Sequence, residues 1–386
     1  MNRRAREIMI VAGEPSADQY GARLVRMLQS RLPSGDSLRF YGTGGDQMAE
    51  AGVRVVCHLR ELASIGPREA AAHLGKYFSV YRQLVAAAGR NPPAVAVLID
   101  FPEFNLRLAR KLKRAGIPVV YYVSPQIWAW RRGRVRLVRR YVDKMAVILP
   151  FEEAFYREHG VQAEFVGHPL LEDFACNRDR EGFLRTLGLP SARPTVALLP
   201  GSRRKEIDYI LPTLLQAARR IRSRLEAQFI VSAAHGADCG QVERILSRSL
   251  DEGEKGAFRI FRGRARDLLS CSDFAFVKSG TATLEAAIVG TPFLVVYRIS
   301  AISWFLGRIL IRSQLKGLVN LVVGREIVPE FIQADATPAA LSRAGLEYLQ
   351  SPEKRDEMKA RLSKVPGLLG ARSASESVAS IVEGYL

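Results

Sequence analysis

The residues of this chain that could perform chemistry are carboxylates placed directly after apolar runs. Asp100 follows the run Ala94–Ile99, and Glu14 follows the run Ile8–Ala12 after a single glycine. An aspartate at the end of a strand, among apolar side chains, can have a raised pKa and accept a proton from a reacting hydroxyl. Alternatively, Asp100 caps the helix that follows, which is the commoner use of such an aspartate. Spacing alone leaves both roles open.

The turn that carries Glu14 joins the first apolar run to a helical pattern. Gly13 permits a tight backbone there, and Ser16 can cap the following helix, whose amides could bind an anionic or hydroxyl-rich group. The turn could also be only a well-capped connection. The chain has neither GxGxxG nor GxxxxGK[ST], so the sequence supports neither a standard dinucleotide site nor a P-loop.

A second turn of this design follows the apolar run Thr195–Leu199. It contains Gly201 and Ser202, and then Arg203 at the start of a helical pattern. Backbone amides together with the guanidinium group could hold a diphosphate without a metal ion. The alternative is a structural turn with a surface arginine.

A third turn of small residues contains Ser279, Gly280 and Thr281, and Glu285 lies one turn into the helix that follows. The carboxylate of Glu285 could accept hydrogen bonds from ribose hydroxyls, or it could only complement the positive end of the helix. Further along, Asn320 opens another loop with an amide and charged groups.

The overall charge is strongly positive, at +18, with 57 Lys and Arg against 39 Asp and Glu. Seven basic residues between Arg131 and Lys144 follow Trp128 and Trp130. Nucleic acid, an anionic membrane surface or phosphorylated substrates would each suit this charge, and a solvated basic helix face would give the same pattern.

Several reaction types lack the residues that they need. The sequence has no D-x-D, HExxH or GxSxG motif, and its five histidines are scattered. The four cysteines lie far apart without a CxxC pair, which fits a reducing compartment. We therefore expect no metal site and no cofactor.

Short apolar runs alternate with amphipathic stretches along most of the chain. This rhythm predicts doubly wound α/β architecture, with parallel sheets covered on both faces. Ligands of such sheets bind at the carboxyl ends of the strands, where the residues above lie. We expect a domain over residues 1–170, a linker with a short helix over 171–190, a second α/β domain over 191–350, and C-terminal helices over 351–386.

The motifs, in this order, resemble the lipid-A-disaccharide synthase family of glycosyltransferases, which has the GT-B fold of two Rossmann-like domains facing an interdomain cleft. The matching segments are AGEPSAD, IDFPEFN, YYVSPQIWAWR, LPFEEAFY, FVGHP, LLPGSR, SGTATLEAA and NLVVGREIVPE. YVSPQIWAWR and LLPGSR are specific to this family, whereas SGTATLE would fit several GT-B enzymes.

The resemblance implies an inverting transfer of diacylglucosamine from UDP-2,3-diacylglucosamine to 2,3-diacylglucosamine 1-phosphate (lipid X). The acceptor 6-hydroxyl attacks the anomeric carbon and gives a β-1′,6 disaccharide phosphate and UDP, without a metal ion. The resemblance further implies peripheral attachment to an anionic membrane, at the cytoplasmic face of a Gram-negative inner membrane, and no specific nucleic acid partner. The oligomeric state stays open.

The resemblance also implies roles for individual residues. Asp100 matches the general base, and Glu14 matches a residue that faces the cleft near substrate sugar. The turn of Gly201, Ser202 and Arg203 would steady the leaving diphosphate. UDP would be held by the residues of the third turn and the loop after it, namely Ser279, Gly280, Thr281, Glu285 and Asn320.

Two departures from the family pattern concern packing and acyl recognition. Ala17 stands where the family usually has glycine, which is tolerated if its φ is negative. Ile65–Ala70 is less apolar than the stretch that contacts acyl chains or membrane in typical members, and Trp304–Arg312 could share that role or form a core helix.

Two other functions stay open from the sequence. One is a different UDP-N-acetylhexosamine enzyme of the same fold, such as a 2-epimerase or a hexosaminyltransferase. The other is a non-enzymatic nucleic acid binder, which would leave Asp100 and Glu14 without a role.

Overall fold

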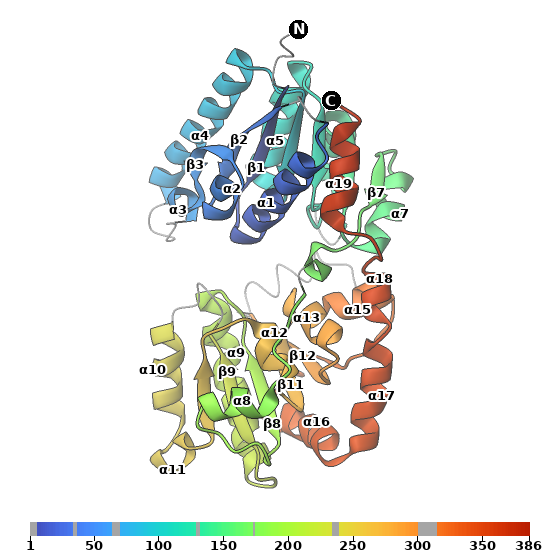
Figure 1. The fold of residues 1–386 in the computed structure, drawn as a ribbon. Coiled ribbons are helices and arrows are strands. Elements are labelled where there is room, and N and C mark those ends of the chain that lie inside the picture. The colour runs from blue at the N-terminus through green and yellow to red at the C-terminus, as the bar shows by residue number, and fades with distance from the viewer. Residues whose placement is uncertain are drawn as a thin grey trace. The chain divides into compact units, whose positions relative to one another are not determined.

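The structure is a computed structural model that describes residues 6–33, 37–63, 70–128, 132–172, 174–233, 239–299 and 315–386. The chain divides into two compact units, each with its own parallel sheet (Figure 1). The first unit comprises Met1–Glu172 and Leu369–Leu386, and the second comprises Asp173–Leu368.

The first unit contains a sheet of seven parallel strands in the order β3-β2-β1-β4-β5-β6-β7. The strands are β1 Arg6–Ala12, β2 Leu38–Gly44, β3 Val53–His58, β4 Val95–Ile99, β5 Val119–Tyr122, β6 Lys144–Val147 and β7 Ala163–Phe165. The α-helices are α1 Pro15–Ser30, α2 Asp46–Glu50, α3 Leu59–Ala63, α4 Ala70–Arg90, α5 Pro102–Arg114, α6 Val135–Tyr141, α7 Pro150–Glu158 and α19 Ala374–Glu383. Short 3₁₀ turns cover Arg132–Arg134 and Pro169–Leu171.

Both faces of this sheet are buried at its centre, because β4 is apolar at every position and β1 is apolar from Ile8 to Ala12. In β1, Met9 and Val11 pack into one core, while Ile8 and Ile10 pack into the other. Burial of successive side chains on opposite faces is the property of a parallel sheet covered by helices on both sides.

The last helix, α19, returns to the first unit and lies beside α1 (Figure 1). Val378 and Val382 pack into the same core as Leu28 of α1, and Arg31 pairs with Glu376 at 2.9 Å. The structure therefore splits the segment 351–386 that the sequence analysis grouped together, because the apolar face of α19 is buried only against the first unit. Helices α17 and α18 belong to the second unit.

The second unit contains six parallel strands in the order β10-β9-β8-β11-β12-β13. The strands are β8 Thr195–Leu199, β9 Gln228–Ser232, β10 Phe258–Phe261, β11 Phe274–Lys278, β12 Phe293–Tyr297 and β13 Glu330–Ile332. The helices are α8 Arg180–Thr186, α9 Arg204–Arg222, α10 Cys239–Ser249, α11 Glu252–Lys255, α12 Ala265–Ser270, α13 Ala282–Val289, α15 Leu318–Val323, α16 Pro338–Gln350, α17 Pro352–Leu362 and α18 Val365–Leu368.

Each sheet has one position where the winding reverses. In the first unit the reversal lies between β1 and β4, and in the second it lies between β8 and β11. In doubly wound sheets the chain diverges above and below the sheet at this position, which leaves a crevice outside the carboxyl ends of the two strands. The fold thereby selects two pairs of strand ends as candidate sites.

The predicted fold class is confirmed, with two doubly wound parallel sheets and a helical C-terminal region. Strand β5 ends at Tyr122, because the next residue, Val123, has a φ of 63°. None of the helices in the described ranges is long and apolar enough to cross a bilayer.

Candidate active site

Glu14 and Asp100 lie at the reversal of the first sheet. The last residues of β1 and β4, Ala12 and Ile99, are direct partners in the parallel register. Glu14 follows Ala12 by two residues, and Asp100 follows Ile99 immediately. Sheet order thus brings together two carboxylates that are 86 positions apart, by subtraction of their residue numbers.

The backbone of Asp100 is held from three directions in an unusual conformation. Asp100 has a φ of 47° and Phe101 a φ of 52°, in the left-handed region that non-glycine residues rarely adopt. The Asp100 amide donates to the carbonyl of Tyr122 at 2.9 Å. The Asp100 carbonyl accepts from Tyr121 Oη at 2.5 Å and from Asn105 Nδ2 at 2.8 Å. Strained residues fixed in this way are found preferentially at functional sites.

Asp100 does not cap the helix that follows it. The N-cap of α5 is Phe101, and no side-chain hydrogen bond caps that helix. Burial and, to a lesser extent, the nearby charge of Glu14 raise the pKa of Asp100 to about 6, against the effect of a hydrogen bond from the Phe101 amide. A carboxylate with this pKa is ionised at pH 7 to 8 and is a stronger base than an ordinary aspartate.

Gly13 is needed because the ring of Phe101 covers it. A Cβ atom at position 13 would lie 2.3 Å from Phe101 Cγ. Helix α1 begins at Pro15 with Glu14 as its N-cap, so the expectation that Ser16 caps this helix is wrong. Ser16 lies exposed in the first helical turn. Ala17 is helical and has no positive φ, so alanine is tolerated at this position, where the family usually has glycine.

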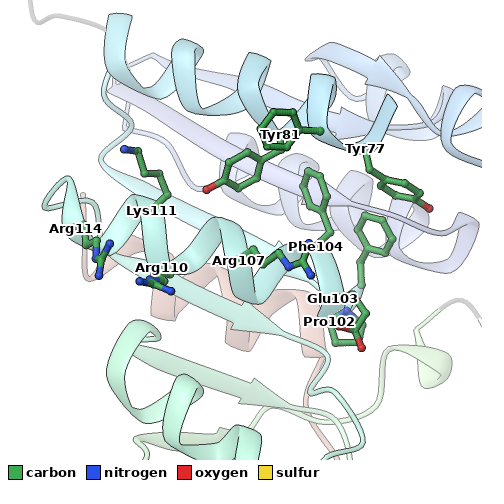
Figure 2. Close-up of a pocket in the computed structure, with 11 residues that line it drawn as sticks. Tyr77, Tyr81, Pro102, Glu103, Phe104, Arg107, Arg110, Lys111 and Arg114 are labelled. Atoms are coloured by element: carbon green, nitrogen blue, oxygen red, sulfur yellow. The ribbon is translucent and has the colours of Figure 1, made fainter. Parts of the chain in front are cut away.

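A pocket of about 1100 Å³ opens beside Asp100, between α4 and α5. Figure 2 shows Tyr77 and Tyr81 projecting from α4 towards Phe104 of α5, with ring centroids 6.4 and 6.2 Å from that ring. The aromatic residues of the pocket are Tyr77, Phe78, Tyr81, Phe101 and Phe104. Its cations, which lie along α5, are Arg107, Arg110, Lys111 and Arg114. No carboxylate of the described residues pairs with these four cations.

In the second unit, the turn after β8 is joined to the end of β11. Gly201 has a φ of 110°, and a Cβ atom there would lie 2.4 Å from Glu206 Oε2. The Glu206 carboxylate accepts a hydrogen bond from the Arg203 amide at 3.4 Å and pairs with Lys278 Nζ at 2.9 Å. The side chains of Ser202 and Arg203 are exposed at the start of α9.

The turn after β11 presents Gly280 and Thr281 beside that site. Ser279 Oγ donates to the carbonyl of Lys316 at 2.7 Å, so its hydroxyl fixes the loop before α15. Glu285 is half-buried on α13, and no described residue donates a hydrogen bond to its carboxylate. Burial raises the pKa of Glu285, while the cation of Arg266 lowers it.

Asn320, for which the sequence predicts a nucleotide contact, has a structural role in the loop after α15. It is fully buried, and its amide donates to the Val328 carbonyl and to Glu330 Oε1, both at 2.8 Å. Its Oδ1 accepts from the amides of Ile327 and Val328 at 2.9 and 3.1 Å. An amide side chain has two donor hydrogens and two acceptor positions, and all four are used here.

Three residues of the site were missed as functional candidates from the sequence. Asn105 and Glu206 each lie near the start of a helix. Asn105 donates a hydrogen bond to the Asp100 carbonyl, and Glu206 accepts one from the Arg203 amide. Glu330 accepts hydrogen bonds from the amides of Lys316 and Gly317 at 2.8 Å. Glu206 could have been found, since a glutamate at the third position of a helix is a capping signal. The other two depend on tertiary contacts.

Parts of the expected site lie outside the described residues. These are most of Ile65–Ala70 and all of Trp304–Arg312, the two stretches considered for acyl or membrane contact, together with Trp130 and Arg131. Within the described ranges, no group of three or more His, Cys, Asp or Glu side chains is arranged to hold a metal ion.

Comparison with known proteins identifies the family. Residues 8–382 match the family model described as lipid-A-disaccharide synthetase. The chain belongs to the lipid-A-disaccharide synthase family. A lipid-A-disaccharide synthase of Syntrophus aciditrophicus is 42% identical over 373 residues, which cover 96% of each chain. Like this family, the chain is a glycosyltransferase of lipid A biosynthesis.

Solved structures of other enzymes share the GT-B arrangement of two α/β units. A UDP-GlcNAc 2-epimerase from Neisseria meningitidis bound to UDP-GlcNAc has a TM-score of 0.68 at 11% identity, covering 98% of this chain and all of that one. The glycotransferase of kitacinnamycin has a TM-score of 0.65 at 16% identity, covering 99% of this chain and all of that one. These structural similarities concern the fold alone. The sequence identity of 42% to a lipid-A-disaccharide synthase, against 11% to the epimerase, assigns the chain to the synthase family.

Proposed function

We propose that the chain transfers 2,3-diacylglucosamine from UDP-2,3-diacylglucosamine to lipid X. The products are the β-1′,6 disaccharide 1-phosphate and UDP. The observation that carries this proposal is the carboxylate of Asp100, with a pKa near 6, directly before Phe101, which lines a pocket of aromatic and cationic side chains. Such a site suits a hydroxyl nucleophile on an amphiphilic, phosphorylated molecule.

Asp100 acts as the general base in this proposal. It takes the proton of the acceptor 6-hydroxyl as that oxygen bonds to the anomeric carbon on the face opposite UDP. The bond from the anomeric carbon to the diphosphate oxygen breaks, and UDP leaves with the electron pair, so the configuration inverts. Glu14 keeps the pKa of Asp100 raised and lies close enough to Tyr77 to affect its pKa as well.

The pocket between α4 and α5 accommodates acyl chains of the acceptor. Aromatic rings supply the apolar wall of this pocket. Burial of each methylene group of an acyl chain against this wall is worth about 0.8 kcal/mol. The unpaired cations of α5 attract the phosphate of the same molecule, and Arg107 is the first of them along the helix after Asp100. An apolar wall with a row of cations matches a molecule that has both acyl chains and a phosphate.

The donor binds in the second unit, where amides at the start of α9 and the guanidinium of Arg203 meet the diphosphate. Ser202 and Thr281 are exposed for contacts with UDP, Gly201 and Gly280 allow close approach of the backbone, and Glu285 accepts hydrogen bonds from ribose. Positive groups of the protein balance the charge of the leaving UDP, so we expect transfer without a divalent metal. The proposed base belongs to the first unit and the donor residues belong to the second, so the proposed transfer requires both units.

The net charge of +18 supports peripheral attachment to the anionic cytoplasmic face of the inner membrane. Flotation with anionic vesicles at low salt, and release at high salt, is the expected behaviour. Equal binding to neutral vesicles would contradict the electrostatic part of this proposal.

The function is tested by mass spectrometry of products formed from UDP-2,3-diacylglucosamine and lipid X in the presence of EDTA. We expect disaccharide from the wild type and a rate lower by about 10²-fold or more for Asp100→Ala. Exposed Glu50, in the same unit, provides the control Glu50→Gln. Equal rates for Asp100→Ala and wild type would remove Asp100 as base. A folded wild type that binds UDP but turns over only unacylated UDP-N-acetylglucosamine would support a 2-epimerase or hexosaminyltransferase instead.

A further inference from the structure

The turn after β5 is held in a strained conformation next to Asp100. Val123 has a φ of 63°, which is rare for a β-branched residue, and its amide donates to the Ala146 carbonyl at 3.1 Å. The strand that leads into this turn supplies Tyr121 Oη and the Tyr122 carbonyl, the two β5 groups that bond to the backbone of Asp100. A shift of this turn would therefore be transmitted to Asp100 through β5.

Glu152, on α7, holds the far end of the same turn. Its side chain is buried, with 1% of the residue exposed. Oε1 accepts a hydrogen bond from Trp128 Nε1 at 2.9 Å, and Oε2 accepts one from the Leu149 amide at 3.1 Å. The Trp128 ring also packs edge-on against Phe151, with centroids 4.8 Å apart.

Tyr156, one helical turn beyond Glu152, holds the near end. Its hydroxyl shares a hydrogen bond with Ser124 Oγ at 2.8 Å, and both side chains are buried. Ser124 stands three residues after Tyr121, so the α7 contact lies close in the chain to the β5 side chain that bonds to Asp100. Two side chains of one helix thus fix both ends of the turn 123–128.

We propose that Glu152 is a positioning residue for the transfer reaction, whose ionised carboxylate holds Trp128 and thereby keeps the turn 123–128 in place beside Asp100. This inference rests on the proposed function, because it takes Asp100 to be the base. Glu152 itself touches no reacting atom.

The ionised form is required because Trp128 and Leu149, the partners at 2.9 and 3.1 Å, can only donate. The indole N–H of Trp128 and the amide of Leu149 each need an acceptor, and a carboxylate offers one oxygen to each. Protonation places a hydrogen on one of these oxygens, so one of the two buried donors loses its good acceptor. The turn is then held less firmly.

The protonation of Glu152 falls near neutral pH. Burial raises its pKa to about 7, although hydrogen bonds from Leu149, Trp128, Ser124 and Ile148 act in the opposite direction. The facing groups of the turn and of residues 148–149 are uncharged, and no charged side chain of the described residues compensates the carboxylate. The titratable neighbour is Tyr156, on the same helix, whose pKa burial raises above its usual range, so it remains neutral.

The first test is the pH dependence of kcat at saturating substrates. If Asp100 and Glu152 must both be ionised, log kcat falls with a slope approaching about 2 below pH 6. Glu152→Gln, and Trp128→Phe, which keeps a ring against Phe151, should each reduce this slope to about 1 and lower kcat at pH 8 by about 10²-fold, with little change in KM. Exposed Glu158 of the same helix gives the control Glu158→Gln, which should behave as wild type.

The second test does not depend on activity. The chain has three tryptophans, so ¹⁵N-indole spectra contain few signals, and Trp128 is assigned by the signal that Trp128→Phe lacks. The Trp128 indole signal should titrate with a midpoint of about pH 7 in the wild type and not in Glu152→Gln. A slope of about 1 in the wild type, or an indole signal that does not titrate near pH 7, would overturn the proposal. A wild type with no disaccharide activity would refute the proposed function, while the indole titration would still decide whether Glu152 holds the turn.

Discussion

The replacement Asp100→Asn should stabilise the folded protein above pH 6 while removing most of its activity. In the folded state the pKa of Asp100 is raised from 3.8 to about 6, so this state binds the proton more tightly than the unfolded chain does. The stability that Asp100 contributes is therefore present below pH 3.8 and is lost as the pH rises through about 6. Asparagine has nearly the same shape and stays neutral at every pH.

The size of the effect follows from the shift in pKa. A shift of about 2 units corresponds to roughly 3 kcal/mol at pH 8, and the same relation gives less than about 1 kcal/mol at pH 4. For a unit of this size, about 1 kcal/mol changes Tm by roughly 2–4 °C, so we expect an increase of up to about 6–12 °C at pH 8. Asparagine also tolerates the left-handed backbone at position 100, which adds a gain that does not vary with pH.

Thermal unfolding of wild type and Asp100→Asn at several pH values between 4 and 8 measures this effect without any substrate. The difference in Tm should grow with pH, and Glu50→Gln, which removes an exposed carboxylate of the same unit, should show no such growth. A difference that stays constant from pH 4 to pH 8 would refute the raised pKa of Asp100 and the argument that it is a strengthened base.

Three further outcomes are expected. Glu14→Gln removes a charge that raises the pKa of Asp100, so the fall of kcat at acid pH should move to lower pH. A fall at the same pH as in the wild type would exclude an electrostatic effect of Glu14 on Asp100. Gly13→Ala places a methyl group 2.3 Å from an aromatic carbon and should lower stability by about 1–3 kcal/mol together with kcat, whereas Gly89→Ala, with open space around its Cβ, should not lower either. Arg203→Ala should lower kcat/KM for the UDP-sugar by roughly 10- to 100-fold with unchanged Tm, and normal donor kinetics would remove this residue from the diphosphate site.

The strands and the candidate turns were predictable because both are local features of the sequence. The run Ala94–Ile99 coincides with β4 apart from one residue, and glycine-containing turns follow β1 and β8 as expected. Helix α4 is harder to predict, because its aromatic side chains Tyr77 and Phe78 line an open pocket. Strand β13 is hard to predict because three residues are too few to show alternation.

The sequence alone determined which residue types stand at the ends of strands, and it carried the motifs that identify the family. Only the tertiary structure decided which strand ends are neighbours, because parallel pairing joins segments far apart in the chain and leaves no local signal. That pairing places Asp100 beside Glu14, buries it enough to raise its pKa, and surrounds its backbone with Tyr121 and Asn105. It also gave Asn320 a structural role, since burial and four hydrogen bonds depend on neighbours that no spacing reveals.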